Sequence, residues 1–147
     1  MKIIRGNRSF ELEEFLKKPL FAHLSTLADE GPRESPVWFH WEDECLWIIG
    51  SKTSDSFPGR IEQNPACAIG IVDFDHTTGK VLHAGFRGHA TVEPFNIDIA
   101  NNLFRRYLGP NRQEWDPRFT THREDDILIR FVPETVVVRD QSFQPSI

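Results

Sequence analysis

The chain has 147 residues, 39% of them apolar and 27% charged, which are the size and composition of one globular domain spanning residues 1–147 rather than of a disordered segment. Its formal charge is −5 and no segment is densely basic, so nucleic acid, which is bound through phosphate-neutralising Lys and Arg, is excluded as a partner. No apolar run reaches the length of a membrane span and the first residues do not form a signal peptide, so no membrane contact is expected and the expected compartment is the cytoplasm.

Aromatic residues are numerous for a chain of this length, with 12 Phe, 4 Trp and 1 Tyr. Rings in this number predict that some of them line a pocket or a subunit interface in addition to the core. The two cysteines, Cys45 and Cys67, stand alone within strand-like runs. They are therefore predicted to be reduced core residues of a cytosolic protein.

The first half of the chain predicts a helix followed by strands. Ser9 can cap a short helix over Phe10–Lys18, whose acidic residues precede its basic ones, and Pro19 ends it. Runs rich in apolar and β-branched residues, separated by turn residues, predict three strands at Leu20–Leu27, Arg33–Trp41 and Cys45–Ile49. Their close spacing favours a meander.

The middle of the chain predicts a second short helix and two longer strands. The helix covers Phe57–Gln63 and ends before an Asn-Pro pair, and the strands cover Ala66–Phe74 and Val81–Val92. Gly85 and Gly88 lie inside the last of these strands, where glycine is typical of a bulge or a sharp bend.

The last third predicts a well-capped helix, a long polar loop and a final strand. The helix covers Ile97–Leu108 with Asn96 as its N-cap, the loop runs over Asn111–Asp126, and the strand covers Ile127–Arg139. Pro133 inside this strand indicates a partly exposed edge. Six strands with inserted helices and glycine bends predict a mainly β protein, a small closed or half-closed antiparallel barrel.

The first candidate for a binding segment is the strand that contains Pro36. Proline cannot donate a ladder hydrogen bond, so pairing must fail locally and leave backbone N–H and C=O groups available to a ligand. A flavin ring has an edge of alternating donors and acceptors, and Trp38, Phe39 and Trp41 offer flat apolar surface for its faces. The alternative interpretation is an edge strand with aromatic core residues.

A second candidate is the hydroxyl-rich loop Gly50–Ser56 with the helix after it. The loop offers N–H and O–H donors and Lys52, and the helix offers its N-terminus and Arg60, which together suit a phosphate. Asp55 would repel a phosphate unless it points outward. The alternative is a solvated loop in which Ser54 or Ser56 caps the helix.

Arg87 and Gly88 form a third candidate, because an arginine beside glycines on a bent strand can reach into a shared cavity; the alternative is an exposed arginine. No metal site is predicted, since the six histidines are scattered and the cysteines lack ligand spacing. The glycines do not form a dinucleotide fingerprint, and no nucleophile elbow is present.

The order of these segments resembles a known family. A short helix is followed by "SPVWFHW", "GSKTS", "NPACAIGIVDF", "FRGHATV" and "ILIRFVPETVVV". This order is similar to that of the pyridoxamine 5′-phosphate oxidase-like family, the FMN-binding split-barrel proteins, and the similarity spans roughly Phe10 to Val138.

The resemblance implies a six-stranded antiparallel split barrel that forms a homodimer with cofactor sites at the interface. By position in the motifs, it places Ser35, Pro36, Val37 and Trp38 along the isoalloxazine, and Ser51, Lys52, Thr53 and Ser54 at the ribityl chain and phosphate. It brings Arg87 and Gly88 to the site from the partner subunit. Many relatives carry a basic residue where this chain has Phe57, and Lys52 or Arg60 would then supply that charge.

The function predicted from this resemblance is an FMN-dependent oxidoreductase that acts on an unknown small substrate. The flavin itself transfers the hydride or electrons, which agrees with the lack of an evident acid–base pair. The tail over Arg139–Ile147 lacks the substrate signature of true pyridoxamine phosphate oxidases, so that reaction is not expected. The alternatives are a deazaflavin (F420), a haem with His40 or His89 as axial ligand, or a non-catalytic flavin-binding or sensor dimer.

Overall fold

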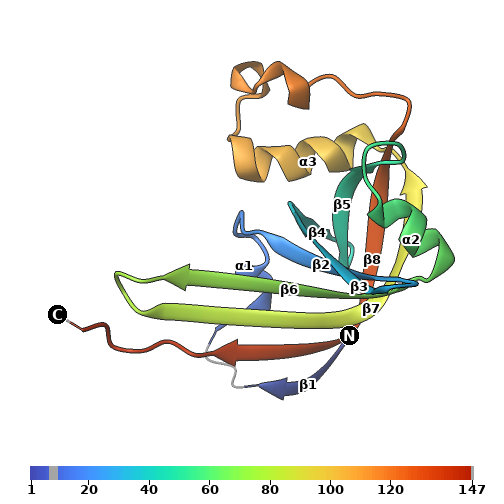
Figure 1. Cartoon of the computed structure of the whole chain (residues 1–147). Helices are drawn as coiled ribbons and strands as arrows, with labels where there is room; N and C mark the ends of the chain where they lie inside the picture. Colours follow the sequence, from blue (N-terminus) through green and yellow to red (C-terminus); the bar gives the residue numbers. More distant parts are fainter. Residues whose placement is uncertain (7–9, 147) are drawn as a thin grey trace.

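The computed structural model describes residues 1–6 and 10–146, with the side chains of residues 5 and 6 left out (Figure 1). Strands make up most of its regular structure. The strands are β1 (Lys2–Gly6), β2 (Ala22–Ala28), β3 (Gly31–Val37), β4 (His40–Glu42), β5 (Cys45–Ser51), β6 (Ala66–Asp75), β7 (Lys80–Pro94) and β8 (Asp126–Asp140). The helices are α1 (Leu12–Phe15), α2 (Phe57–Gln63), α3 (Ile97–Leu108) and the 3₁₀ turns η1 (Arg112–Glu114) and η2 (Pro117–Phe119).

These strands form one sheet in the order β3-β2-β6-β7-β8-β5-β4, with β1 beside β8. Every pair along this path is antiparallel, and β1 pairs with β8 in parallel. The two ends of the path, β3 and β4, follow each other in the chain with only Trp38 and Phe39 between them. The sheet must therefore curve round until its ends meet, and it is a split barrel because those ends do not pair. The predicted mainly β split-barrel architecture is confirmed.

The strand count differs from the six predicted, because eight strands occur in the described residues. The predicted run Arg33–Trp41 divides into β3 and β4 at Trp38, where the chain passes from one end of the sheet to the other. The strand β1 was not predicted at all. Its register, from Lys2 opposite Thr135 onward, joins residues far apart in the chain, and no local pattern reports such a pairing.

The strand β8 lies inside the sheet, but at Pro133 it has a partner strand among the described residues on one side only, in agreement with the predicted partial edge. The strand β8 pairs with β5 through residue 131 and with β1 from Thr135, so Pro133 falls where β8 changes its neighbour. On the β7 side the register shifts between Arg87 and Gly88, which leaves Glu134 unpaired as a bulge. A missing N–H is tolerated at a bulge, and the bend predicted from Gly88 is confirmed.

The helices α2 and α3 have the predicted bounds. The Asn96 side chain accepts hydrogen bonds from the backbone N–H groups of Asp98 and Ile99, as predicted for the N-cap of α3. The first helix is shorter than predicted, because α1 covers Leu12–Phe15 and turns follow it; the proposed cap Ser9 lies outside the described residues.

The core lies inside the curve of the sheet, where its largest fully buried side chains are Phe15, Phe39, Phe86 and Phe131. Cys45 and Cys67 are buried and unpaired, as predicted, and burial raises the pKa of the Cys67 thiol to about 11. No helix in the described part of the chain is long and apolar enough to span a membrane.

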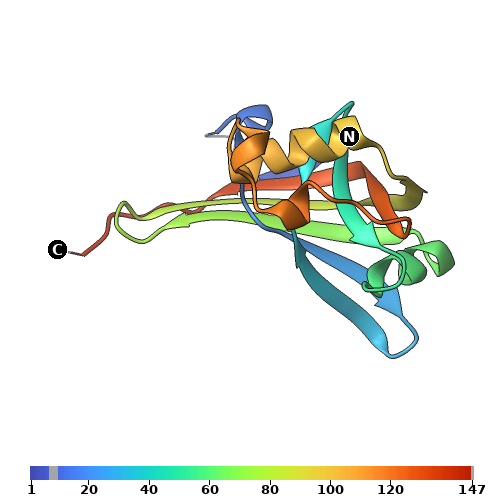
Figure 2. The same ribbon diagram turned by 90° about the horizontal axis from the view of Figure 1, so that it is seen from above.

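Two regions extend from this core. In Figure 1, α3 and the segment with η1 and η2 lie above the curved part of the sheet, and the long halves of β6, β7 and β8 run out to the left. Figure 2 shows the β2–β3 hairpin diverging from the other strands on the side away from α3.

Candidate functional site

A cavity of about 430 Å³ lies where the end of β3, the loop after β5, α3 and η2 meet. We call it the aromatic cavity. Its lining residues are Ser35, Pro36, Val37, Trp38, Ile49, Ser54, Asp55, Ser56, Phe57, Leu103, Phe104 and Phe119. The volume falls within the roughly 300–1,000 Å³ of small-molecule sites. The structure thus places the proline-containing strand and the end of the hydroxyl-rich loop side by side around one cavity.

The strand β3 stands at one end of the sheet path and pairs only with β2, with His23 opposite Pro36 and Ala22 opposite Val37. Proline is tolerated there because an edge strand needs ladder donors on one side only. The backbone groups on the free side of β3 have no strand partner among the described residues. They are the groups that the edge of a planar heterocycle can use.

Trp38 is the part of the aromatic segment that reaches the cavity. Its ring stacks on Tyr107 at 4.5 Å between centroids, with an angle of 4°, and on Phe119 at 5.5 Å. Phe39 is fully buried in the core, and the Trp41 indole N–H donates to Glu13, so neither lines the cavity. One of the three rings expected to face a ligand therefore does so.

Hydrogen bonds to backbone groups hold α3 against the β3–β4 link. The Tyr107 hydroxyl accepts from the Phe39 N–H at 3.0 Å and donates to the Leu20 carbonyl at 2.6 Å. The Arg106 guanidinium donates to the carbonyls of Leu16 and Lys18, at 2.9 and 2.7 Å, and to that of Phe39. Burial lowers the pKa of Arg106, which has no carboxylate partner in the described chain.

These contacts were not predicted, because Arg106 and Tyr107 look in sequence like the ordinary end of an amphipathic helix. The carbonyls that they bind are 67–90 residues away in the chain. Their effect is that α3, with Leu103 and Phe104, stands as a fixed wall of the aromatic cavity.

The hydroxyl-rich loop is largely committed to a carboxylate within the chain. The Ser51 and Thr53 hydroxyls both donate to Asp125, the former at 2.7 Å, and the Ser51 N–H donates to Asp55 at 2.8 Å. The hydrogen bonds from Thr53 and Ser51 hold the pKa of the Asp125 carboxyl below its usual value. Of the four loop residues placed at the ribityl chain and phosphate, the structure brings only Ser54 to the aromatic cavity, and Ser51, Lys52 and Thr53 do not line it.

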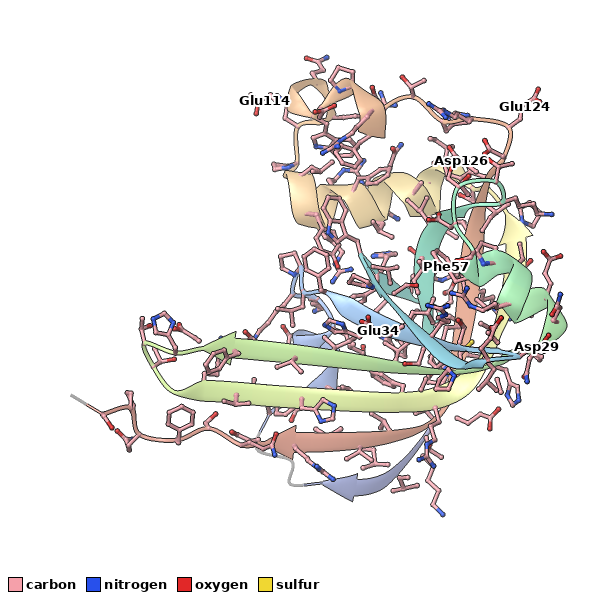
Figure 3. All side chains as sticks on the ribbon, in the orientation of Figure 1. Asp29, Glu34, Phe57, Glu114, Glu124 and Asp126 are labelled. Carbon is pink, nitrogen blue, oxygen red and sulfur yellow. The ribbon has the colours of Figure 1, made fainter. Side chains whose placement is uncertain are left out.

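Phe57 fills the position at which the family resemblance expects a basic residue. Its side chain is 5% exposed and lies so close to Gly50 that a Cβ there would stand 3.1 Å from two of its ring carbons. Figure 3 shows Phe57 at the start of α2, within the fold, and Asp29 and Glu34 on the β2–β3 hairpin. The aromatic cavity has no Lys, Arg or His among its lining residues, so a cation for a phosphate must come from beyond it.

A second hollow, of about 680 Å³, adjoins the aromatic cavity and shares Ser35 and Ser56 with it. We call it the polar groove. Its lining residues are Ala28, Asp29, Glu30, Arg33, Glu34, Ser35, Ser56, Gly59, Arg60 and Gln63. The Arg60 Nε donates to the Thr26 hydroxyl at 2.7 Å. Arg60, predicted near the phosphate, therefore stands in this groove and not in the aromatic cavity.

Arg87 and Gly88 lie elsewhere in this chain. Arg87 lines two hollows, of about 570 and 430 Å³, that are both lined by residues of β6, β7 and β8, and the second also reaches β2 and β3. Gly88 lines the second, and neither hollow shares a residue with the aromatic cavity. A single chain does not bring these two residues to the candidate site. The sequence-based expectation already assigned them to a partner subunit.

The two histidines considered as haem ligands also lie outside the aromatic cavity. The His40 Nδ1 is buried without a hydrogen-bond partner, and burial lowers the pKa of this ring. His89 is exposed and contacts Glu134. The described residues contain no group of three His, Cys, Asp or Glu side chains that could hold a metal ion.

No protein-family profile and no curated protein sequence matches the chain. Solved structures do. An F420 reductase is 26% identical with a TM-score of 0.62, covering 84% of this chain and 94% of its own. The haem storage protein HutZ of Vibrio cholerae is 18% identical with a TM-score of 0.69 over 97% of both chains. A Listeria innocua protein assigned as a pyridoxamine 5′-phosphate oxidase is 16% identical with a TM-score of 0.64, over 87% of this chain and 98% of its own.

Proposed function

Because the chain has the split-barrel fold of the pyridoxamine 5′-phosphate oxidase-like flavin- and haem-binding proteins, we propose that it is an FMN-dependent oxidoreductase with the isoalloxazine in the aromatic cavity. The observation that supports this most is the cavity itself, which joins the free edge of β3 to the end of the hydroxyl-rich loop. Its substrate is a small molecule that the sequence does not identify.

The lining of the aromatic cavity fits a flavin ring on three counts. The free side of β3 at Ser35–Val37 offers backbone donors and acceptors to the polar edge of the ring. Leu103, Phe104 and Phe119 offer apolar contacts and exclude water from it. The bound flavin would supply the redox chemistry, while the chain binds and orients the ring.

A flavin fits the aromatic cavity better than a haem does. Haem iron is held by an axial His, Cys, Met or Tyr side chain, and none of these residues lines the cavity. His40 and His89, which would have to supply such a ligand, face other parts of the molecule. Haem in HutZ therefore does not carry over to this cavity by residue.

A homodimer is part of the proposal. The face of β6, β7 and β8 is hollowed at Ala68, Gly70 and Gly85 and carries apolar Ile4 and Val137, which suits a second copy of the chain. A second copy is also the route by which Arg87 and Gly88 would approach a cofactor. This face would then contribute the partner's part of the site.

The visible spectrum of the purified full chain, followed by titration with FMN, tests the proposal. We expect flavin absorbance or saturable FMN binding, and bleaching of the bound flavin by NAD(P)H. Ser54→Trp should fill the aromatic cavity and weaken FMN binding by about tenfold or more, while the exposed Glu62→Trp on α2 should not.

Three results would contradict the proposal. A Soret band in the absorption spectrum would show that the protein binds haem. Binding of a deazaflavin but not of FMN would show that the cofactor is a deazaflavin. FMN binding without bleaching by NAD(P)H would leave a flavin-binding or sensor module, and would refute the enzymatic part.

A further inference from the structure

The aromatic cavity and the polar groove meet at Ser35 and Ser56, so that one elongated ligand can occupy both. We propose that the polar groove binds the phosphate monoester of the flavin through Arg60 and excludes cofactors that continue beyond that phosphate. This inference rests on the proposed flavin function and concerns the other end of the same ligand.

Arg60 is held in place by a contact that leaves most of its donors free. Its Nε donates to the hydroxyl of Thr26, a residue of β2 that is 1% exposed. A guanidinium has five N–H donors, and the two Nη groups of Arg60 have no hydrogen bond or ion pair within the described part of the chain. A fixed, half-buried guanidinium with free paired donors is well suited to the oxygens of a phosphate.

The junction of the two hollows supplies neutral donors beside this cation. Ser35 comes from β3 and Ser56 from the residue before α2, and both line the aromatic cavity as well as the polar groove. Neither hydroxyl has a hydrogen-bond partner among the described residues. A phosphate at this junction would therefore find two O–H donors next to the Arg60 guanidinium without displacing any contact.

The hydroxyl-rich loop is a poorer place for the phosphate, although the sequence pointed there. A phosphate dianion beside Ser51 and Thr53 would have to displace the Asp125 carboxylate, and the Asp55 carboxylate already accepts the hydrogen bond of the Ser51 N–H. Like charges at such distances repel each other strongly where water is partly excluded. Phe57 adds no compensating charge, whereas the polar groove holds two cations, Arg33 and Arg60, of which Arg60 is the one fixed by the buried Thr26.

The polar groove also holds three carboxylates, and these set the expected selectivity. Asp29, Glu30 and Glu34 line it together with Arg33. The terminal phosphate of FMN ends at Arg60. The second phosphate of FAD, or the glutamyl carboxylates of a deazaflavin tail, would continue toward these side chains and be repelled. The groove thus favours a single terminal phosphate.

Binding of FMN, riboflavin and FAD to the full chain, followed by flavin fluorescence, tests both parts. The wild type should bind FMN at least about tenfold more tightly than riboflavin. Arg60→Gln should reduce this ratio to near one by weakening FMN alone, and the riboflavin affinity reports that the variant is folded. The exposed Arg105→Gln on α3 is the matched control and should leave the ratio unchanged.

A separate double variant tests the selectivity for FMN over FAD. Asp29→Asn combined with Glu30→Gln should tighten FAD by about threefold to tenfold relative to FMN, because two carboxylates leave its path. An unchanged ratio would refute the exclusion of longer cofactors.

The outcomes separate this inference from the proposed function. If the wild type binds neither riboflavin nor FMN, the flavin proposal itself fails. If it binds both and Arg60→Gln keeps the FMN-to-riboflavin ratio of the wild type, the flavin proposal stands and the phosphate site is wrong.

Discussion

The α3 end and the long-strand end of this molecule bury apolar surface in different ways. At the α3 end, stacked rings and the backbone hydrogen bonds of Arg106 and Tyr107 close a cavity within one chain. At the other end, where β6, β7 and β8 run out from the core, Phe74 remains 59% exposed and Val72 46% exposed (Figure 1). The first end closes its cavity with contacts within one chain, whereas the second leaves exposed apolar surface of the kind that another molecule covers.

The strands β7 and β8 run through both ends of the molecule, and Gly88→Ala should disrupt the pairing between them. A Cβ at Gly88 would stand 2.1 Å from the carbonyl oxygen of Val132 and 3.0 Å from the Cα of Pro133, and backbone cannot move aside as a side chain does. We expect a loss of about 3 kcal/mol in the free energy of unfolding, measured by denaturant titration. Gly70→Ala, whose Cβ meets nothing within 4 Å, is the control and should cost less than about 0.5 kcal/mol. Equal costs for the two would contradict this.

Arg106→Met should damage the α3 end alone. It removes charge-assisted hydrogen bonds to the carbonyls of Leu16, Lys18 and Phe39, and should lower the free energy of unfolding by about 2–3 kcal/mol. Because the wall of the aromatic cavity loosens, flavin binding should weaken too. Arg105→Met on the exposed side of α3, where the Arg105 side chain donates to Asn102, should change neither quantity. A wild-type stability for Arg106→Met would show that the cavity wall does not depend on this residue.

Asp73 on β6 connects the two ends, because it binds Lys80 on β7 and Lys18, whose carbonyl accepts from Arg106 of α3. The stabilisation that Asp73 provides should depend on pH. Burial raises the pKa of Asp73, but hydrogen bonds from Lys18, at 2.8 Å, and Lys80, at 3.0 Å, together with their charges, lower it below its usual value overall. The stabilisation is therefore fully present above about pH 4, the ordinary aspartate pKa, and is lost as the pH falls through the lowered value.

Asp73→Asn should accordingly cost about 1 kcal/mol at pH 7, less at high salt, because both lysines are partly exposed. The difference from wild type should shrink progressively below pH 4 as the wild-type carboxylate is protonated. Unfolding curves recorded from pH 7 down to the acid transition measure this. A difference that stays constant over that range would rule out a charge effect.

The parts of the fold that the sequence predicted depend on local cues. Asn96 and Gly109 mark the ends of α3, and Asn64 with Pro65 marks the end of α2, because caps and breakers act on neighbouring residues. Pro36 likewise pointed to an edge strand with free backbone groups, and β3 stands at the end of the sheet path.

The parts that the sequence could not predict depend on distant partners. Asp125 accepts hydrogen bonds from the Ser51 and Thr53 hydroxyls, more than 70 residues away in the chain, so the groove beside Arg60 suits a phosphate better than the loop does. The parallel pairing of β1 with β8 is of the same kind. Composition and periodicity indicate which face of a helix or strand is buried, but they do not indicate which other element packs against that face.

The smallest effect on folding, and a direct test of the unfinished end, is expected from Gly70→Arg. Gly70 lines the hollow on β6, β7 and β8, and its Cβ direction is open, so the substitution should change the stability of a single chain by no more than about 0.5 kcal/mol. If a second copy packs on this face, the long charged side chain would hold the two copies apart beside Arg87 and Arg139, which also line the hollow. Analytical ultracentrifugation should show a dimer for the wild type and a monomer for Gly70→Arg.

The control for this variant is an arginine at the opposite end of the molecule. Glu114 is exposed on η1 (Figure 3), and Glu114→Arg should leave the dimer intact, because it introduces the same side chain far from β6 and β7. A wild-type chain that stays monomeric, or a Gly70→Arg chain that stays dimeric, would show that this face is not where two copies meet. Arg87 would then have no route to a partner's cofactor, and the site would consist of the aromatic cavity and the polar groove of one chain.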